Sequence, residues 1–195
     1  MLVGMSFQVI FPQYHSTWII ICVFFILDYA IVCEINSMID GVTGLLNKTV
    51  FNNQISHLHI DENDNYYIIM MDINDFKTVN DTKGHLYGDK CLREIASILE
   101  NVFKRNGNVF RFGGDEFCVL INAKSDLAFK QLIDNLHREI LLCREKNDNL
   151  PGLAIGFSKF RPGSSIHEII DDADFNMYNT KKMMKDKVDS DVFIL

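Results

Sequence analysis

A chain of 195 residues has room for one domain of ordinary size and a short additional segment. Its hydrophobic share of 48% is ample for a packed core, whereas its formal net charge of −7 argues against a nucleic-acid scaffold, because duplex binding normally needs a strongly basic face. A nucleotide substrate is still compatible with this charge, since a phosphate site needs only a few local cations and a metal ion.

The N-terminal segment differs from the rest, since no Lys or Arg precedes Lys48. Residues 17–33 form an apolar run of about the minimum length for a membrane span, interrupted only by Asp28. One Asp near the middle costs about 2.5–3.5 kcal/mol on insertion scales, which the surrounding Ile, Phe and Leu can offset. We expect residues 1–37 to form a hydrophobic helix that anchors the chain in a membrane. A soluble helix that pairs with its copy in a dimer is the alternative.

Residues 38–195 show the pattern of one α/β domain. Helices are expected over residues 42–58, 86–104, 127–143 and 166–184, with a short helical piece from Asp75 that Gly84 breaks. Strands are expected over residues 66–73, 109–112, 117–121, 153–157 and 192–195. Because strands and helices do not alternate regularly, we expect a mixed, mainly antiparallel sheet flanked by helices.

A hairpin is predicted at Gly113-Gly114, with these two residues as its turn. Glycines let the backbone turn tightly and let a bulky ligand lie against it. Asp115 and Glu116 follow directly and enter an apolar strand, where alternation sends them to opposite faces. At least one of them is therefore expected to point toward the face used for chemistry. An ordinary hairpin with exposed acids is the alternative.

Asp72 lies at the end of the apolar run over residues 66–73, where a solvated surface charge is not expected. It can cap the turn that begins at Asn74. If its strand neighbours the hairpin, Asp72 joins Asp115 and Glu116 in a carboxylate cluster able to hold Mg²⁺ together with substrate phosphates. That is the layout of two-metal nucleotidyl transfer.

Several ordered segments resemble the motifs of the GGDEF family. They are RFGGDEF at 111–117, DGVTGLLNK at 40–48, DINDFKTVND at 72–81, GHLYGD at 84–89, AIG at 154–156, and an Ala-Asp pair with Tyr and Lys over 173–181. The resemblance covers residues 38 to 190 and implies a palm-like nucleotidyl cyclase fold. It also implies a diguanylate cyclase, which condenses two GTP into cyclic di-GMP and two pyrophosphates with two Mg²⁺ or Mn²⁺ ions per active site.

The resemblance implies metal ligands and a base. Asp72, Glu116 and the backbone carbonyl of Ile73 would bind the metals. Asp115 would be a further ligand and the base that takes the proton from the attacking 3′-hydroxyl.

The resemblance also implies contacts to GTP. Asn80 and Asp89 would recognise guanine, because an amide and a carboxylate can answer its O6 acceptor and its N–H donors. The other positions implied to contact substrate are Lys77 and Lys181 for the triphosphate, the backbone of Asp75 and Phe76 at a helix start, the turn residues Gly113 and Gly114, and His85, which is a structural histidine in the alternative interpretation.

Two departures from the family pattern matter. The Arg and Asp of the family's inhibitory site are replaced by Lys104 and Gly107, so we expect no inhibitory site. The usual Gly-Arg-Asn after the last helix is Met184-Lys185-Asp186. A catalytically weak or inactive domain that binds GTP and acts as a regulatory module is therefore the alternative function. A polymerase palm is disfavoured by the acidic composition and by the lack of fingers or thumb.

The implied reaction also sets partners and location. The 3′-hydroxyl of each nucleotide attacks the α-phosphate of the other, so a homodimer is required. The catalytic domain is expected on the cytoplasmic side of the cell membrane, where GTP is, or otherwise free in the cytoplasm. Five scattered cysteines without a Cys-x-x-Cys pair fit a reducing compartment.

Overall fold

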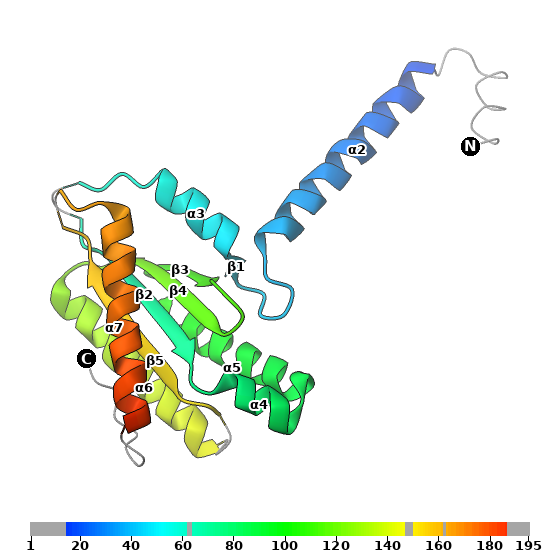
Figure 1. The fold of residues 1–195 in the computed structure, drawn as a ribbon. Coiled ribbons are helices and arrows are strands. Elements are labelled where there is room, and N and C mark those ends of the chain that lie inside the picture. Colours follow the sequence, from blue (N-terminus) through cyan, green and yellow to red (C-terminus); the bar gives the residue numbers. More distant parts are fainter. Residues whose placement is uncertain (1–14, 62–63, 147–149, 162, 187–195) are drawn as a thin grey trace. The chain divides into compact units, whose positions relative to one another are not determined.

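The computed structural model describes residues 15–61, 64–146, 150–161 and 163–186, and the chain forms two units, Met1–Met38 and Ile39–Leu195 (Figure 1). The described residues of the first unit form helix α2 (His15–Met38). Its stretch Trp18–Met38 has 21 residues with a mean hydropathy of 2.4, long and apolar enough to cross a membrane by length and composition. The expected hydrophobic N-terminal helix is therefore present from His15, and residues 1–14 of the predicted segment lie outside the described residues.

The second unit is built on a sheet. Its described strands, in spatial order, are β1 (Leu46–Asn47), β3 (Gly107–Arg111), β4 (Glu116–Asn122), β2 (Tyr66–Ile73) and β5 (Leu153–Lys159). The β1–β3 pair is parallel, and the other three pairs are antiparallel. The prediction of a mixed, mainly antiparallel sheet is confirmed.

Helices cover both faces of this sheet (Figure 1). Helices α5 (His85–Phe103) and α6 (Asp126–Lys146) pack on one face, and α3 (Lys48–Ser56) and α7 (Ile166–Asp186) pack on the other. Strand β2 is buried on both faces, so it reads as a continuous apolar run. Its odd residues Ile69 and Met71 face α5 and α6, and its even residues Ile68 and Met70 face α3 and α7. Asp72 continues the even series.

The helix predicted over residues 42–58 begins later than expected, at Lys48. Leu46 and Asn47 pair with β3 instead, and Gly44 has a φ of +76° that ends the preceding turn. Asn47 Oδ1 accepts hydrogen bonds from the backbone N–H groups of Thr49 (3.0 Å) and Val50 (3.2 Å). This N-cap fixes the helix start, because it satisfies N–H groups that lack a partner within the helix.

The two-residue turn predicted at Gly113-Gly114 is also wrong, because residues 112–115 connect β3 to β4. The backbone N–H groups of Phe112 and Gly113 both donate to the Glu116 carbonyl, at 2.8 and 3.2 Å. The Asp115 carbonyl accepts from the Ile73 N–H at 3.1 Å, so Asp115 is bonded to β2 and not to β3. The strand predicted over residues 192–195 lies outside the described residues.

Close packing of α7 on the edge strand β5 depends on Gly156. A Cβ added there would overlap the backbone nitrogen of Met177 and the carbonyl oxygen of Ala173. One turn further along α7, Thr180 Oγ1 donates to the Ile155 carbonyl at 3.0 Å. Neither backbone atom can move without shifting the helix, so the glycine sets the distance between α7 and the sheet.

We expect Gly156→Ala to lower the free energy of unfolding by about 1–3 kcal/mol, the usual effect of overpacking. Urea unfolding followed by circular dichroism measures it. Gly41→Ala is the matched control, because a Cβ there meets nothing within 4 Å. Equal unfolding curves for the two variants would show that α7 is not held at this distance.

Candidate active site

Two carboxylates meet on neighbouring strands at the end of β2. Asp72 is directly opposite Glu116 in the β2–β4 register. Glu116 has the same parity as Cys118 and Leu120, which pack on the α3 and α7 face, and Asp72 has the same parity as Ile68 and Met70. Both carboxylates therefore lie on the side of the sheet that α7 covers. Asp72 is only 7% exposed.

Lys181 contacts this pair from α7, the helix that covers the same face of the sheet. Its Nζ lies 2.5 Å from Asp72 Oδ1, and the lysine side chain is 27% exposed. Lys185, one turn further along α7, lies 3.9 Å from Asp75 Oδ1, in an exposed pair. One face of α7 thus carries two ammonium groups toward the end of β2.

The surroundings of Asp72 and Glu116 raise the pKa values of both carboxyl groups. Burial raises the pKa of Asp72, although the hydrogen bond from Lys181 opposes that rise. Burial, followed by the neighbouring charges of Asp72 and Asp115, raises the pKa of Glu116. A bound cation would relieve this repulsion. Among the described residues, no three His, Cys, Asp or Glu side chains are close enough to hold a metal ion alone. The set fits Mg²⁺, which commonly binds one or two carboxylates together with substrate phosphates.

Asp115 and Ile73 lie next to this pair along the chain. Asp115 is half-buried and immediately precedes β4, so strand alternation does not fix the direction of its side chain. Its charge still raises the pKa of both Asp72 and Glu116. Ile73 is fully buried, and its N–H bonds to the Asp115 carbonyl.

A cavity of about 400 Å³ opens over the carboxylate pair. Its lining residues are Asp72, Glu116, Asp171, Asp174, Phe175, Met177, Tyr178 and Lys181. Phe175 and Tyr178 are 64% and 61% exposed. Asp171 and Phe175 were not predicted from the sequence as site residues. The signal that could have found them is their helical spacing from Asp174, Tyr178 and Lys181 on one face of α7.

The guanine candidates lie on α4 (Phe76–Lys83) and α5, which follow β2 along the chain. Asn80 and Asp89 are both half-buried. A Cβ added at Gly88 would overlap the Asn80 side-chain oxygen, so the Asn80 amide lies against the residue that precedes Asp89. His85 is the first residue of α5 and is exposed.

The start of α4 has an unusual backbone. In the described part of the chain, Asp75 is the only residue other than glycine with a positive φ, 52°. This left-handed residue sits at the N-cap position, and its side chain makes no capping hydrogen bond. The first N–H groups of the helix, from Phe76 onward, point away from the helix body, where phosphate oxygens can bind. Lys77 is exposed in the first turn.

Arg111, the first residue of the signature, holds the glycine turn in place. Its Nη1 donates to Asp40 Oδ1 (2.9 Å), and its Nη2 donates to the Gly114 carbonyl (2.7 Å). Burial raises the pKa of Asp40, but hydrogen bonds from Thr43 and Arg111 outweigh it and hold the pKa below its ordinary value. The sequence motifs include both residues, yet nothing in the sequence alone pairs them across 71 positions.

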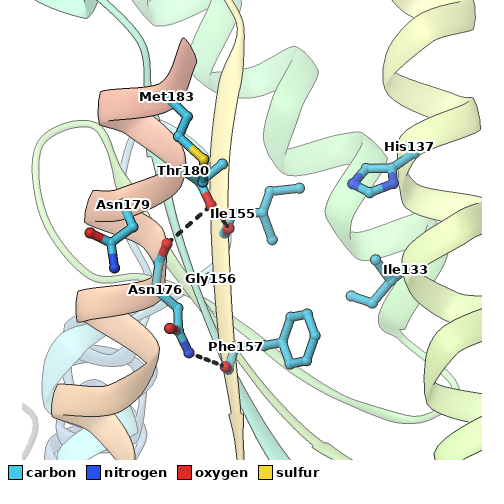
Figure 2. A pocket seen from close by; sticks show the side chains of 9 residues that line it. All are labelled: Ile133, His137, Ile155, Gly156, Phe157, Asn176, Asn179, Thr180 and Met183. Carbon is cyan, nitrogen blue, oxygen red and sulfur yellow. Dashed lines mark hydrogen bonds between the residues drawn. The ribbon is translucent and has the colours of Figure 1, made fainter. Parts of the chain in front are cut away.

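A second cavity, of about 320 Å³, lies between α6 and α7 along β5 (Figure 2). His137 points into it from α6, with a pKa lowered by burial. Asn176 Nδ2 donates to the Phe157 carbonyl at 3.0 Å, which covers part of the sheet edge. Among the described residues that line this cavity, none is Lys, Arg, Asp or Glu. It therefore offers no charge to a triphosphate, and the nucleotide chemistry belongs to the first cavity.

Comparisons with known proteins agree with this geometry. The family model "Diguanylate cyclase, GGDEF domain" matches residues 37–187. Diguanylate cyclase DgcZ of Escherichia coli is 34% identical over 80% of this chain and 54% of its own length, and diguanylate cyclase VdcA of Vibrio cholerae is 28% identical over 78% and 47%. The chain spans about half the length of these relatives. The GGDEF domain of DgcB from Caulobacter crescentus, solved with c-di-GMP, superimposes with a TM-score of 0.67 at 25% identity, covering 75% of this chain and 91% of that domain.

We expect Glu116→Gln to be at least as stable as the parent when metal is removed with EDTA. Because the pKa of Glu116 is raised in the folded state, the proton-linked stability of the parent is present below the ordinary value of 4.5 and is lost as the pH rises through the raised pKa. The amide cannot ionise, so the advantage of the variant should grow between about pH 4 and pH 7.

Chemical unfolding over this pH range checks the prediction, with the exposed carboxylate variant Glu145→Gln as control. A Glu116→Gln protein that is less stable than both the parent and the control at pH 7 would contradict the repulsion inferred here.

Proposed function

Because the chain belongs to the GGDEF family of diguanylate cyclase domains, we propose that it condenses two GTP molecules into cyclic di-GMP and two pyrophosphates. The observation that carries this proposal is the pairing of Asp72 with Glu116 on adjacent strands, with Lys181 facing them. Carboxylates and an ammonium group around one cavity suit a triphosphate that arrives with divalent metal.

Asp72, Glu116 and the Ile73 carbonyl would hold Mg²⁺ or Mn²⁺, two ions per site. When bound, the metal offsets the charge on the phosphates and polarises the phosphorus–oxygen bonds. The raised pKa values of Asp72 and Glu116 support this assignment, since burial, with a smaller contribution from neighbouring carboxylates, disfavours the ionised forms that a bound cation would stabilise.

The reaction forms one bond and breaks one at each α-phosphorus. The 3′-oxygen of one nucleotide attacks the α-phosphorus of the other, its proton passes to Asp115, and pyrophosphate leaves. Lys181 releases Asp72 and binds triphosphate oxygens instead, and Lys77 adds a second ammonium charge. Backbone N–H groups at Asp75 and Phe76 bind phosphate oxygens. The turn at Gly113-Gly114 lets the nucleotide lie close to the backbone.

Guanine is read by the α4–α5 pair. The Asp89 carboxylate accepts hydrogen bonds from the N1–H and N2–H groups, and the Asn80 amide answers the remaining polar edge. Both side chains are half-buried, which strengthens such bonds relative to water. His85, exposed at the start of α5, contacts the substrate from the rim.

One chain supplies one half of the reaction. Each site activates one α-phosphate and needs the 3′-hydroxyl held by a facing copy, so the active form is a homodimer. We also propose that residues 1–37 anchor the protein in the cell membrane, with the catalytic domain of residues 38–195 on the cytoplasmic side. The apolar stretch Trp18–Met38 supports the anchor by its length and composition, and the cytoplasmic side is proposed because GTP is there.

A GTP-binding regulatory module without turnover is the second candidate. It is favoured by Met184-Lys185-Asp186, which replace the Gly-Arg-Asn usual in the family after its last helix motif. Lys185 is exposed and only 3.9 Å from Asp75, and Met184 Sδ accepts from Asn74 Nδ2. An ammonium cannot reproduce the paired hydrogen bonds of an arginine to phosphate.

Turnover of labelled GTP with Mg²⁺, with products separated by chromatography, distinguishes the two functions. The full chain should yield cyclic di-GMP and pyrophosphate in a ratio of one to two. Asp72→Asn should lower the rate by at least about 100-fold, since groups that stabilise charge at a reacting centre contribute about 10²–10³. Glu145→Gln should leave the rate unchanged. GTP binding without product would establish the regulatory module instead.

We expect Gly88→Ala to weaken the discrimination of GTP from ATP about as strongly as Asn80→Ala, although residue 88 has no side chain to bind the base. The added methyl displaces the Asn80 amide, and an unpaired polar edge of guanine costs about 1–3 kcal/mol. Competition binding of the two nucleotides measures it. Gly41→Ala serves as control, and an unchanged GTP preference in Gly88→Ala and Asn80→Ala would show that the base is read elsewhere.

Product inhibition should be absent in this chain. Lys104 follows α5 with an exposed ammonium, and Gly107 begins β3 with no room for a side chain, because a Cβ there would overlap the Leu120 carbonyl. We expect added cyclic di-GMP at low micromolar concentration to change initial rates less than about twofold. Progress curves at fixed GTP test it.

The double variant Lys104→Arg/Gly107→Asp should not restore inhibition, since the strand cannot accommodate the aspartate. Potent inhibition of the parent chain that is lost on changing Lys104, or Arg105 directly after it in the sequence, would contradict this account.

A further inference from the structure

Lys48 lies at the end of the sheet that carries the carboxylate pair. It is the first residue of α3, which covers the same face of the sheet as the pair, and it directly follows β1. Strand β1 is parallel to β3, so both end near the start of β4, where Glu116 pairs with Asp72 of β2. The strand order β1, β3, β4, β2 therefore sets Lys48 on the opposite side of Glu116 from Asp72.

An aromatic ring holds the Lys48 ammonium group in this position. Lys48 Nζ lies 4.1 Å from the centre of the Phe112 ring. The ring is itself fixed, because the buried Phe51 meets it edge-on at 5.2 Å and the Phe112 N–H donates to the Glu116 carbonyl at 2.8 Å. A ring face attracts an ammonium group through its charge and leaves lysine N–H donors available to other acceptors.

Lys48 forms no ion pair with any residue in the described part of the chain, and its side chain is exposed. Lys181, Lys185 and Arg111, by contrast, are each paired with a carboxylate. The positive charge of Lys48 still reaches Glu116. Burial is the main influence on the pKa of Glu116 and raises it, and Lys48 opposes that rise. The ammonium group is therefore near the site and has its donors free.

We propose that Lys48, held over the Phe112 ring, binds phosphate oxygens of the nucleotide as a third ammonium group, on the Glu116 side of the carboxylate pair. This inference rests on the proposed function and adds a cation to its site. The other two ammonium groups lie on the Asp72 side, because Lys181 contacts Asp72 and Lys77 is in the first turn of α4, which follows β2.

A cation on the Glu116 side changes how far the phosphates can extend. Glu116 lines the cavity, and Lys48 lies beyond Glu116, outside the lining. Phosphates that extend past Glu116 come within reach of the flexible lysine side chain. With an ammonium group on each side, negative phosphates can lie across both carboxylates once divalent metal is bound.

The charge of Lys48 should act in opposite directions on the two ligands. A positive charge beside Glu116 repels a divalent cation and attracts phosphate. Loss of that charge should therefore weaken nucleotide binding without weakening the binding of metal alone. A lysine that only supported the start of α3 would, when lost, weaken both ligands together.

Titration calorimetry of Lys48→Met in the full chain tests the proposal. A non-hydrolysable GTP analogue with Mg²⁺ should bind at least about tenfold more weakly than to the parent, the usual effect of losing a hydrogen bond to a charged group. Guanosine, which has no phosphate, should bind within about twofold of the parent value. Mn²⁺ alone, followed by electron paramagnetic resonance, should bind at least as tightly as to the parent.

Two further variants separate charge from structure. Lys48→Arg should keep the affinity for the analogue within about threefold, since a guanidinium group also binds phosphate and stacks on a ring. Lys130→Met is the matched control, because Lys130 is exposed on α6 and loses the same charge on the other face of the sheet. Its affinities should equal those of the parent.

The ring is tested by Phe112→Leu, which should weaken binding of the analogue about two- to fivefold, the range of an exposed cation–π contact. The double variant Lys48→Met/Phe112→Leu should bind within about twofold of Lys48→Met, because the ring acts through the lysine. Fully additive losses would overturn the role given to the ring.

Equal affinity of the parent and Lys48→Met for the analogue overturns the proposal, as does a loss that guanosine or Mn²⁺ alone shares. GTP turnover by the same proteins separates this question from the proposed function. Weaker analogue binding by Lys48→Met, together with a parent that makes no cyclic di-GMP, supports the phosphate contact and contradicts the proposed activity. Synthesis by the parent with unchanged analogue binding in Lys48→Met does the reverse.

Discussion

The register between β2 and β4 is the constraint on which the rest of the site depends. It sets Asp72 opposite Glu116, and it is fixed by alternating apolar residues packed on both faces of the sheet. A slip of one residue would turn Glu116 away from Asp72 and bury polar groups against α5. The bond from the Ile73 N–H to the Asp115 carbonyl ends the pairing at the right place, and Arg111 ties the connecting turn to Asp40.

The same register places the carboxylates of Asp72 and Glu116 side by side, where their negative charges do not stabilise the fold. Burial raises the pKa of Asp72 and of Glu116, the charge of Asp115 adds to both rises, and the charge of Asp72 adds to that of Glu116, so each carboxylate opposes folding when it is ionised. Lys181 offsets part of this charge, and α7 can bring it there because Gly156 allows the helix to approach the sheet. A site that is unfavourable when empty and satisfied by cation and phosphate is suited to binding both. The left-handed backbone at Asp75, placed between β2 and α4, is a second local strain at the same edge.

Sequence patterns predicted the elements that have a strong period. Strand β2 was predicted with the bounds that the structure shows, because its apolar run is continuous, and the helix face of α5 was predicted from its spacing. The start of α3 and the turn before β4 were wrong, because both depend on pairing with distant strands and not on local preference. Residues alone suggested a carboxylate cluster, and the guanine and phosphate positions came from family resemblance. The contacts of Lys181 with Asp72 and of Arg111 with Asp40 join positions 109 and 71 residues apart, for which no local pattern exists.

The central claim is that strand pairing creates a divalent-metal site that is completed by nucleotide. Electron paramagnetic resonance of Mn²⁺ added to the full chain with a non-hydrolysable GTP analogue measures this directly. The account predicts bound Mn²⁺ in the parent protein, at least about tenfold weaker binding when either Asp72 or Glu116 becomes its amide, and no change for Glu145→Gln. Equal Mn²⁺ binding by the parent and by a double variant in which Asp72 and Glu116 are both amides would contradict it.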